Sequence, residues 1–219
     1  MKKVANLALL GLFAGVLAMP ATAQEYRFTY SKLYSQMKNN IKEGHEDVKV
    51  GFFFVDAQSQ QLCNIEKAWM EKEEKYEELK TSEYNELLVP LDGNLKQANP
   101  LVYIHTPPMK QCDFSMVVMT KEPLSGKVSY QDVANLLPQM QTMLADLGGM
   151  FSGWFTADVT GLTLEFAEQE NGRIELSGGD FIEISNGKAQ VLLEEIGKNG
   201  FMQLPSKTSR VLPYIPSAN

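Results

Sequence analysis

The sequence predicts an α+β, β-rich protein built from antiparallel, sandwich-like sheets with two or three helices. Short runs of β-branched and aromatic residues, such as residues 48–55, recur along the chain and are typical of strands. Asn-Gly pairs at residues 171–172 and 186–187 indicate tight turns in the C-terminal third. Helical spacing of apolar residues is found around residues 30–41 and 133–147.

The N-terminus has the features of a secretory signal peptide. Lys2 and Lys3 precede an uncharged run, residues 4–18, and a small-x-small cleavage site ends at Ala23, before Gln24. The apolar run is shorter than the ~20 residues that a helix needs to span a bilayer. We therefore expect cleavage between Ala23 and Gln24, a periplasmic or secreted mature protein, and no membrane span.

The charge of the chain argues against nucleic acid as a partner. The 219 residues include 20 Lys and Arg and 27 Asp and Glu. Removing the 23 N-terminal residues takes two lysines away, so 18 basic residues face 27 acidic ones and the mature net charge is −9. A phosphate backbone or an anionic membrane surface would be repelled. A basic protein, a cationic peptide or a neutral glycan stays open as a partner.

The two cysteines, Cys63 and Cys112, predict one structural disulfide, because an even pair in an oxidising compartment normally forms a bridge. The loop closed is about 50 residues, for which chain entropy gives a stabilisation of ~4 kcal/mol. Their separation of 49 positions argues against a redox pair, which would favour C-x-x-C spacing.

In the N-terminal region an amphipathic helix is expected over residues 30–41, where apolar residues recur every three or four positions, and Gly44 ends it. The run 48–55 predicts a central strand. A second strand is expected to begin at Leu62 and to continue through Trp69.

Residues 66–86 contain eight acidic and four basic residues. The middle of this stretch, 70–80, has strong helix propensity, with Glu71 and Lys75 at i, i+4. A charge run of this kind is typical of a solvated face, and an acidic docking patch is the alternative.

Three extended segments are expected next. Residues 86–93 predict a strand that runs into a turn, and residues 100–106 and 112–120 predict the two strands of a hairpin joined through a Pro-Pro connection. Cys112 would lie near the turn of that hairpin.

A second helix is predicted over residues 130–147. Ser129 and Asp132 resemble a capping box, and Gly148-Gly149 ends the helical spacing. Pro138 lies inside and is expected to kink the helix or split it into two.

The methionines Met140, Met143 and Met150 fit the core at this spacing, and an adaptable hydrophobic binding surface is the alternative. Trp154 and Phe155 follow in a glycine- and aromatic-rich link. We consider these two aromatics candidate binding residues, with a place in the core as the alternative.

The remainder of the chain predicts a β-meander, with extended segments at residues 162–166, 173–176, 181–184 and 191–193 and a proline-punctuated edge strand within 204–216.

We expect four segments: a signal peptide over residues 1–23, an N-terminal disulfide-containing β-rich domain with one N-terminal helix over 24–124, a helical segment over 125–150, and a C-terminal β-rich region over 151–219. The last region could be continuous with the first. Similar patterns of strand, proline and loop at 86–104 and 199–215 leave open a duplication of two related β units, beside one domain with two similar turns.

Patterns that carry catalytic chemistry are nearly absent from the sequence. The two histidines, His45 and His105, are not part of an H-E-x-x-H motif. Glu46 and Asp47 follow His45, but neighbours on an extended strand point to opposite faces, so convergence of all four on a metal is not expected. No nucleophile elbow and no phosphate-binding glycine loop is present. We expect no metal and no cofactor.

Several segments together resemble a family of uncharacterised exported proteins of gammaproteobacteria, known as a domain of unknown function. These segments are residues 51–56, 63–70, 86–92, 99–100 and 112–115. The resemblance covers most of residues 26–120. It implies a Gram-negative periplasmic setting and transfers no activity and no functional residues.

The first functional hypothesis is a non-enzymatic periplasmic binding or envelope-associated protein whose partner is an envelope protein or a glycan. Strand edges at 86–90 or 204–213 could pair with a partner strand. Exposed aromatic residues could contact the partner: Tyr76, Tyr84, Trp154 and Phe155.

The alternative is a periplasmic carboxylate-dependent hydrolase of glycan or cell wall. Asp158, Glu194 and Glu195 are candidates only because 27 acidic residues make a chance pair certain. Such an enzyme should bring acids together in a pocket, with the pKa of at least one raised.

Overall fold

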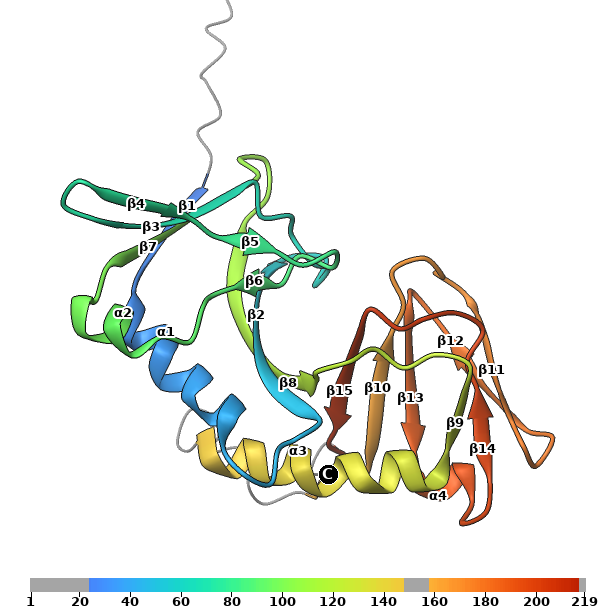
Figure 1. Cartoon of the computed structure of the whole chain (residues 1–219). Helices are drawn as coiled ribbons and strands as arrows, with labels where there is room; N and C mark the ends of the chain where they lie inside the picture. Colours follow the sequence, from blue (N-terminus) through green and yellow to red (C-terminus); the bar gives the residue numbers. More distant parts are fainter. Residues whose placement is uncertain (1–23, 148–157, 217–219) are drawn as a thin grey trace, which may run out of the picture.

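The computed structural model describes residues 24–147 and 158–216. It shows a β-rich fold in which the strand pairs are antiparallel, as the sequence predicts, and no sheet closes into a barrel. An N-terminal lobe and a C-terminal lobe lie side by side above one long helix (Figure 1). Within the described ranges, no helix is long and apolar enough to cross a membrane.

The N-terminal lobe contains a four-stranded sheet in the order β1-β7-β3-β4. Its strands are β1 (Gln24–Thr29), β7 (Leu101–Thr106), β3 (Lys67–Lys72) and β4 (Lys75–Glu78). The long strands β2 (Val48–Asp56) and β8 (Cys112–Thr120) pair with each other along their whole length. The short strands β5 (Lys80–Thr81) and β6 (Leu87–Leu88) form a further pair.

Aromatic side chains join the two main sheets of this lobe. The ring centroids of Tyr26 and Phe54 lie 4.7 Å apart, and so do those of Phe28 and Phe114. One face of β1 therefore packs on the β2–β8 pair, and it is the opposite face of its sheet that is turned away from the core.

The predicted helix over residues 30–41 is confirmed. It consists of α1 (Tyr30–Met37) and a 3-10 turn (Lys38–Ile41). Tyr30 is fully buried, and its hydroxyl donates to the Pro90 carbonyl oxygen at 2.6 Å and accepts from the Asp92 backbone N–H at 2.9 Å. This residue ties α1 to the segment before β7.

A short helix that the sequence analysis missed, α2 (Gly93–Ala98), follows that segment. The Asp92 carboxylate caps it by accepting from the backbone N–H groups of Asn94 and Leu95. The predicted strand over residues 86–93 was wrong in extent, because only Leu87 and Leu88 pair as a strand.

The long helix α3 (Tyr130–Leu147) confirms the prediction over residues 130–147. Asp132 Oδ2 accepts from the backbone N–H of Ser129 at 2.8 Å, which completes the predicted capping box. Of the two outcomes expected at Pro138, a kink or a split, the split does not occur: the helix is continuous, because packing against both lobes outweighs one lost backbone hydrogen bond. Met140 and Met143 are fully buried, as the core interpretation predicts, while Met150 and Gly148-Gly149 lie outside the described residues.

The C-terminal lobe consists of two antiparallel sheets, in the orders β13-β10-β15 and β12-β11-β14-β9. The strands of the first are β13 (Lys188–Leu192), β10 (Gly161–Glu165) and β15 (Arg210–Tyr214). Those of the second are β12 (Phe181–Ile184), β11 (Gly172–Leu176), β14 (Phe201–Gln203) and β9 (Lys127–Ser129). The short helix α4 (Leu193–Ile196) follows β13.

The Asn186-Gly187 turn has the predicted positive φ angles, 52° and 73°. It does not close a hairpin between two strands of one sheet. The chain passes from β12 to β13, which belong to different sheets, and across the turn Ser185 and Lys188 form an isolated antiparallel bridge.

Three further expectations were wrong. Residues 70–80 form a β-hairpin of β3 and β4 instead of a helix, with a turn at Glu73, whose φ is 55°. The second strand begins at Lys67, and Leu62 makes only one bridge, to Val55. The expected hairpin of residues 100–106 and 112–120 does not exist, because β7 pairs with β1 and β3 whereas β8 pairs with β2. The limits of β3 and the pairing of β7 follow from partners distant in sequence, whereas β4 pairs with its neighbour β3.

The two segments compared as a possible repeat differ in structure. Helix α2 separates β6 from β7, whereas no helix lies between β14 and β15. The edge strand predicted within 204–216 is confirmed as β15, which pairs with β10 alone.

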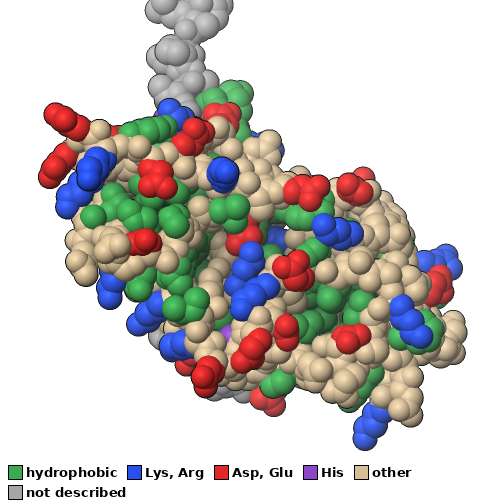
Figure 2. Space-filling view, viewed as in Figure 1, with side chains coloured by type: hydrophobic (Ala, Val, Ile, Leu, Met, Phe, Trp, Pro, Cys, Tyr) green, Lys and Arg blue, Asp and Glu red, His purple; other side chains and the backbone are tan. Residues whose placement is uncertain are grey.

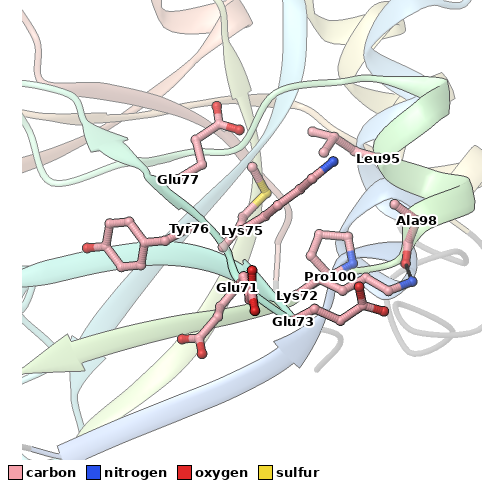
Figure 3. Close-up of a pocket in the computed structure, with 11 residues that line it drawn as sticks. Glu71, Lys72, Glu73, Lys75, Tyr76, Glu77, Leu95, Ala98 and Pro100 are labelled. Atoms are coloured by element: carbon pink, nitrogen blue, oxygen red, sulfur yellow. Dashed lines mark hydrogen bonds between the residues drawn. The ribbon is translucent and has the colours of Figure 1, made fainter.

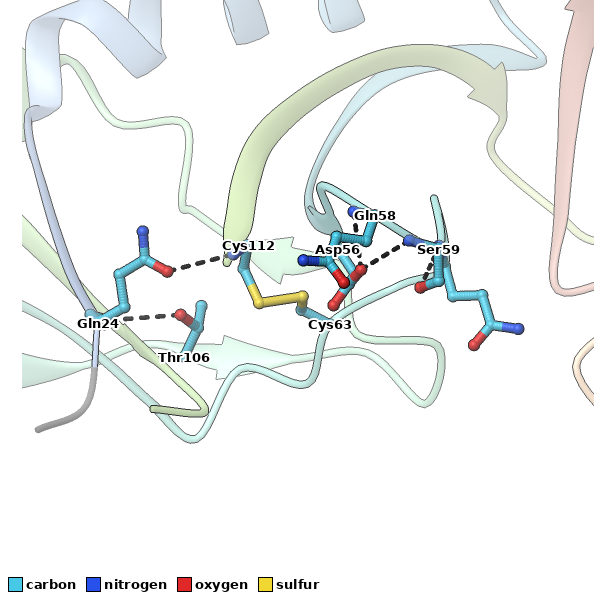
Figure 4. Close-up of a disulfide and its surroundings, with 8 residues drawn as sticks. Gln24, Asp56, Gln58, Ser59, Cys63, Thr106 and Cys112 are labelled. Carbon is cyan, nitrogen blue, oxygen red and sulfur yellow. Dashed lines mark hydrogen bonds between the residues drawn. A yellow bond between two sulfur atoms is a disulfide. The ribbon is translucent and has the colours of Figure 1, made fainter. Parts of the chain in front are cut away.

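The predicted disulfide between Cys63 and Cys112 is present, with a Cα–Cα distance of 6.2 Å (Figure 4). Both cysteines are buried. The bridge fixes the loop after β2 to the first residue of β8, and the Cys112 backbone N–H donates to Gln24 Oε1 at 3.2 Å. The start of β1, the loop and β8 are therefore held together at one end of the lobe.

Candidate functional site

The β3–β4 hairpin ends in a strand that is fully exposed to solvent. Strand β4 is at the edge of its sheet, it pairs only with β3, and all four of its residues are exposed. In Figure 1 the hairpin extends beyond the rest of the lobe. An edge strand of this kind presents unpaired backbone groups to solvent.

The register shows which backbone groups are free. The Leu79 backbone N–H donates to the Ala68 carbonyl oxygen at 2.8 Å, so Leu79 faces β3. Hydrogen-bonding direction alternates along an antiparallel strand, so Glu77 also faces β3, while Tyr76 and Glu78 turn their N–H and C=O groups outward. Two residues of β4 are thus available to a further strand.

The outer face of the sheet carries three aromatic side chains in a row, which we call the aromatic ladder: Tyr103, Trp69 and Tyr76. The rings of Trp69 and Tyr103, which are cross-strand partners, stack at 5.1 Å with an angle of 9°. Tyr76 stacks on Trp69 at 6.3 Å and is 52% exposed. Trp69 and Tyr103 are therefore partly covered by stacking, and the Tyr76 ring is the one most accessible to solvent.

Contacts with charged side chains fix the orientation of the rings in the aromatic ladder. Lys67 Nζ lies 5.0 Å from the centre of the Trp69 ring and 5.6 Å from that of Tyr76. The indole N–H of Trp69 donates to Glu71 Oε2 at 3.1 Å. These contacts leave the three aromatic side chains preorganised, which lowers the entropy lost when they bind a partner.

The inner face of the hairpin borders a hollow of about 690 Å³, which we call the hairpin hollow (Figure 3). Met70, Leu95 and Pro100 give it an apolar floor. Lys72 closes one side by donating from Nζ to the Ala98 carbonyl oxygen at 2.6 Å, so α2 forms the opposite wall. Figure 3 shows Tyr76 pointing away from this hollow.

The hairpin is acidic. Glu71, Glu73, Glu74 and Glu77 line the hollow, against Lys72 and Lys75, so the negative charges exceed the positive ones by two. The expectation of a solvated charge run is correct for β4, but the run belongs to a strand pair. The acidic docking patch, the alternative interpretation, describes the same residues.

The structure separates the aromatic residues proposed from the sequence. Tyr76 belongs to the ladder, whereas Tyr84 is half-buried and lines a cleft between the lobes. Trp154 and Phe155 lie outside the described residues. Sequence reasoning missed Trp69 and Tyr103 as surface residues, although both alternate with buried neighbours in their strands.

The strand edges proposed at 86–90 and 204–213 differ from β4. Only two residues of the first form a strand, and the second includes the first four residues of β15, of which Arg210 and Val211 are buried. The open edge lies instead within the segment expected to be helical.

The histidines do not come together. His45 is buried, with Nε2 3.3 Å from Asp146 Oδ2, while His105 Nε2 lies 2.9 Å from Glu25 Oε2 on the outer face of the β1-β7-β3-β4 sheet. Glu46 accepts from the Gly44 backbone N–H instead. Within residues 24–147 and 158–216, no group of three or more His, Cys, Asp or Glu could hold a metal.

Four carboxyl groups have a lowered pKa. Hydrogen bonds lower the pKa of Glu46, Asp56 and Asp132, each through a nearby Gly or Ser. Burial raises the pKa of Glu165, but Arg210 and Lys188 outweigh it and hold that pKa below its usual value. None of the four is a candidate general acid by this criterion.

Of the three carboxylates considered for a hydrolase, one has a structural role. Glu195 Oε2 accepts from the Leu192 backbone N–H at 2.7 Å and so caps α4, next to Glu194. Asp158 is exposed before β10.

A family model described as a protein of unknown function, DUF2987, matches residues 22–166. The match extends from β1 to the end of β10 and includes the hairpin, the ladder and α3. No curated protein and no solved structure matches the chain.

Proposed function

Since this chain belongs to the DUF2987 family, whose description assigns no activity, we propose a function from its geometry: it is a non-enzymatic binding protein that pairs an extended segment of a partner with β4. The observation that carries the proposal is the open edge of β4, with the outward backbone groups of Tyr76 and Glu78.

Strand addition fits the surroundings of this edge. An added strand gains main-chain hydrogen bonds from the edge, and its side chains alternate between the two faces of the sheet. On one face they would meet Tyr76, the member of the ladder at the sheet edge, and on the other the hairpin hollow with its apolar floor. Both faces therefore offer contacts that could give specificity.

Charge selects the kind of segment. The excess of glutamates around the hollow attracts a basic segment and repels an acidic one. The same excess disfavours pairing of β4 with β4 of a second copy. We therefore propose a basic, extended segment of an envelope protein as the partner.

We further propose that this binding takes place in the periplasm, after removal of residues 1–23. The charge and apolar pattern of that segment supports export. The hydrolase alternative has less support, because a general acid needs a raised pKa whereas four carboxyl groups have a lowered one: Glu46, Asp56, Asp132 and Glu165.

The proposal can be tested by selecting peptides from a displayed random library on the purified mature protein. Glu78→Pro removes an outward N–H and leaves the hydrogen bonds between β3 and β4 intact, since proline is tolerated at strand edges. Glu78→Ala is the matched control, because it removes the same side chain and keeps the N–H. We expect basic peptides that bind the wild type and Glu78→Ala but not Glu78→Pro. Equal binding to all three would refute strand addition at β4.

A further inference from the structure

A second cavity, of about 250 Å³, lies between the two lobes and shares no lining residue with the hairpin hollow. Lys49, Phe53, Lys121, Lys207 and Arg210 are among the residues that line it. Figure 2 shows Lys and Arg side chains gathered around a hollow at the centre of this face. A local positive cluster is notable in a chain whose net charge is −7.

Arg210 is the key residue of this cleft. It is only 5% exposed, and its Nε and Nη2 both lie 2.6 Å from the same Glu165 oxygen. Its Cζ lies 4.6 Å from the centre of the buried Phe53 ring. The remaining nitrogen, Nη1, is buried without a hydrogen-bond partner. A buried donor without an acceptor costs free energy, which an acceptor atom of a ligand would recover.

The other cations of the cleft are only partly neutralised. Glu165 is shared between Arg210 and Lys188, whose Nζ lies 3.0 Å away, so one carboxylate faces two positive charges. Lys121 Nζ donates to a backbone carbonyl oxygen, that of Glu46, at 2.7 Å. Lys207 has no ion pair within the described residues.

Carboxylates at the cleft do not cancel this excess. Glu86 is buried and committed to Lys49, at 2.8 Å. Glu83 is the other lining carboxylate, and it is exposed. Together with Glu165 they make three negative charges. Five positive charges lie against them: Lys49, Lys121, Lys207, Arg210 and Lys188, which also contacts Glu165.

We propose that this cleft binds an oxyanion group, the phosphate or carboxylate of a small ligand, between Arg210 and the lysines at its rim. The guanidinium edge opposite Glu165 supplies directed donors, and Lys121 and Lys207 supply charge. The volume accommodates such a group with a few further atoms. The site is independent of the β4 edge, so either proposal can fail alone.

Isothermal titration calorimetry of the mature protein at pH 7 tests the site. The probes are inorganic phosphate and acetate, each compared with chloride at equal ionic strength. Saturable binding of phosphate alone identifies a phosphate ligand, and binding of acetate identifies a carboxylate. Heats no larger than those with chloride for both probes would overturn the proposal.

Variants then locate the binding. The double variant Lys121→Gln/Lys207→Gln removes two exposed cations, and Lys198→Gln is the matched control, an exposed lysine in the loop between α4 and β14. We expect the double variant to bind roughly tenfold more weakly and the control to bind as the wild type does. Arg210→Lys keeps a positive charge near Glu165 and should also weaken binding. Wild-type affinity in the double variant would place the anion elsewhere.

Discussion

Strands β4 and β15 both lie at the edge of a sheet, but β15 is covered whereas β4 is open to solvent. Strand β15 is the edge of its sheet, but Arg210 and Val211 are buried, Pro213 lies within it, and β8 packs beside it. Strand β4 has no proline, no covering element among the described residues and four exposed side chains. Natural proteins protect their edges by burial, proline and charge. Charge is the only one of these protections at β4, and we therefore propose that it accepts a partner of opposite charge, whereas β15 is covered.

The edge strand β15 is also fixed electrostatically. Glu165 of β10 is the direct cross-strand partner of Arg210 in β15 and of Lys188 in β13. A buried carboxylate thus joins the three strands of the sheet. Among the described residues, no buried ion pair joins β3 and β4, so this edge can change its conformation without breaking one.

The largest effect is expected from the disulfide, which is found only in the lobe with the open edge. Replacing both cysteines, Cys63→Ser with Cys112→Ser, should lower the free energy of unfolding by ~4 kcal/mol, because a loop of about 50 residues is released. Urea unfolding measures the change. A free energy equal to that of the wild type, with thiols counted to confirm oxidation of the latter, would contradict this.

The next largest effect concerns the closed edge. Glu165→Gln should destabilise the protein by ~3 kcal/mol, because it leaves Arg210 buried without its countercharge. Relative to the wild type, Glu165→Gln should accelerate backbone hydrogen exchange in β15 and β10 and leave exchange in β4 unchanged. A loss below 1 kcal/mol on urea unfolding would mean that the ion pair does not hold this edge.

Acid should weaken the closed edge more than the open one. The pKa of Glu165 is lowered in the folded protein from its ordinary value of 4.5, so its contribution is complete above that value and is lost as the pH falls through the folded pKa. Thermal unfolding curves of the wild type and Glu165→Gln should therefore converge as the pH falls through this lowered pKa. Parallel curves throughout would remove Glu165 as the origin of the acid sensitivity.

The smallest effect on stability is expected at the open edge. Tyr76→Ala should change the free energy of unfolding by less than about 0.5 kcal/mol, because the side chain is half exposed. The same change should weaken binding of a selected peptide roughly tenfold, since exposed aromatic anchors contribute strongly to interfaces. Thr81→Ala, an exposed residue of β5, is a suitable control. Strong destabilisation by Tyr76→Ala would show that the ladder is structural.

The features that could be predicted from the sequence are the local ones. The helices over residues 30–41 and 130–147, the Ser129–Asp132 cap and the left-handed turn at Asn186 each depend on neighbours within a few positions. The disulfide followed from the number of cysteines and the expected compartment.

The candidate site depends on contacts between distant residues and could not be predicted. Residues 70–80 have high helix propensity, but Trp69 pairs with Tyr103, 34 positions away, and Met70 is buried against the core. Cross-strand packing of this kind outweighs a preference of tenths of a kcal/mol per residue. Arg210 and Glu165 likewise meet only because β15 pairs with β10.

Backbone amide hydrogen exchange in the β3–β4 hairpin, with and without a selected basic peptide, tests the open edge most directly. In the free protein the amides of Glu77 and Leu79 should exchange slowly, because they face β3, and those of Tyr76 and Glu78 should exchange rapidly. When the peptide binds, the Tyr76 and Glu78 amides should become protected. If both continue to exchange rapidly in the saturated complex, the peptide does not pair with β4 and the proposed function is wrong.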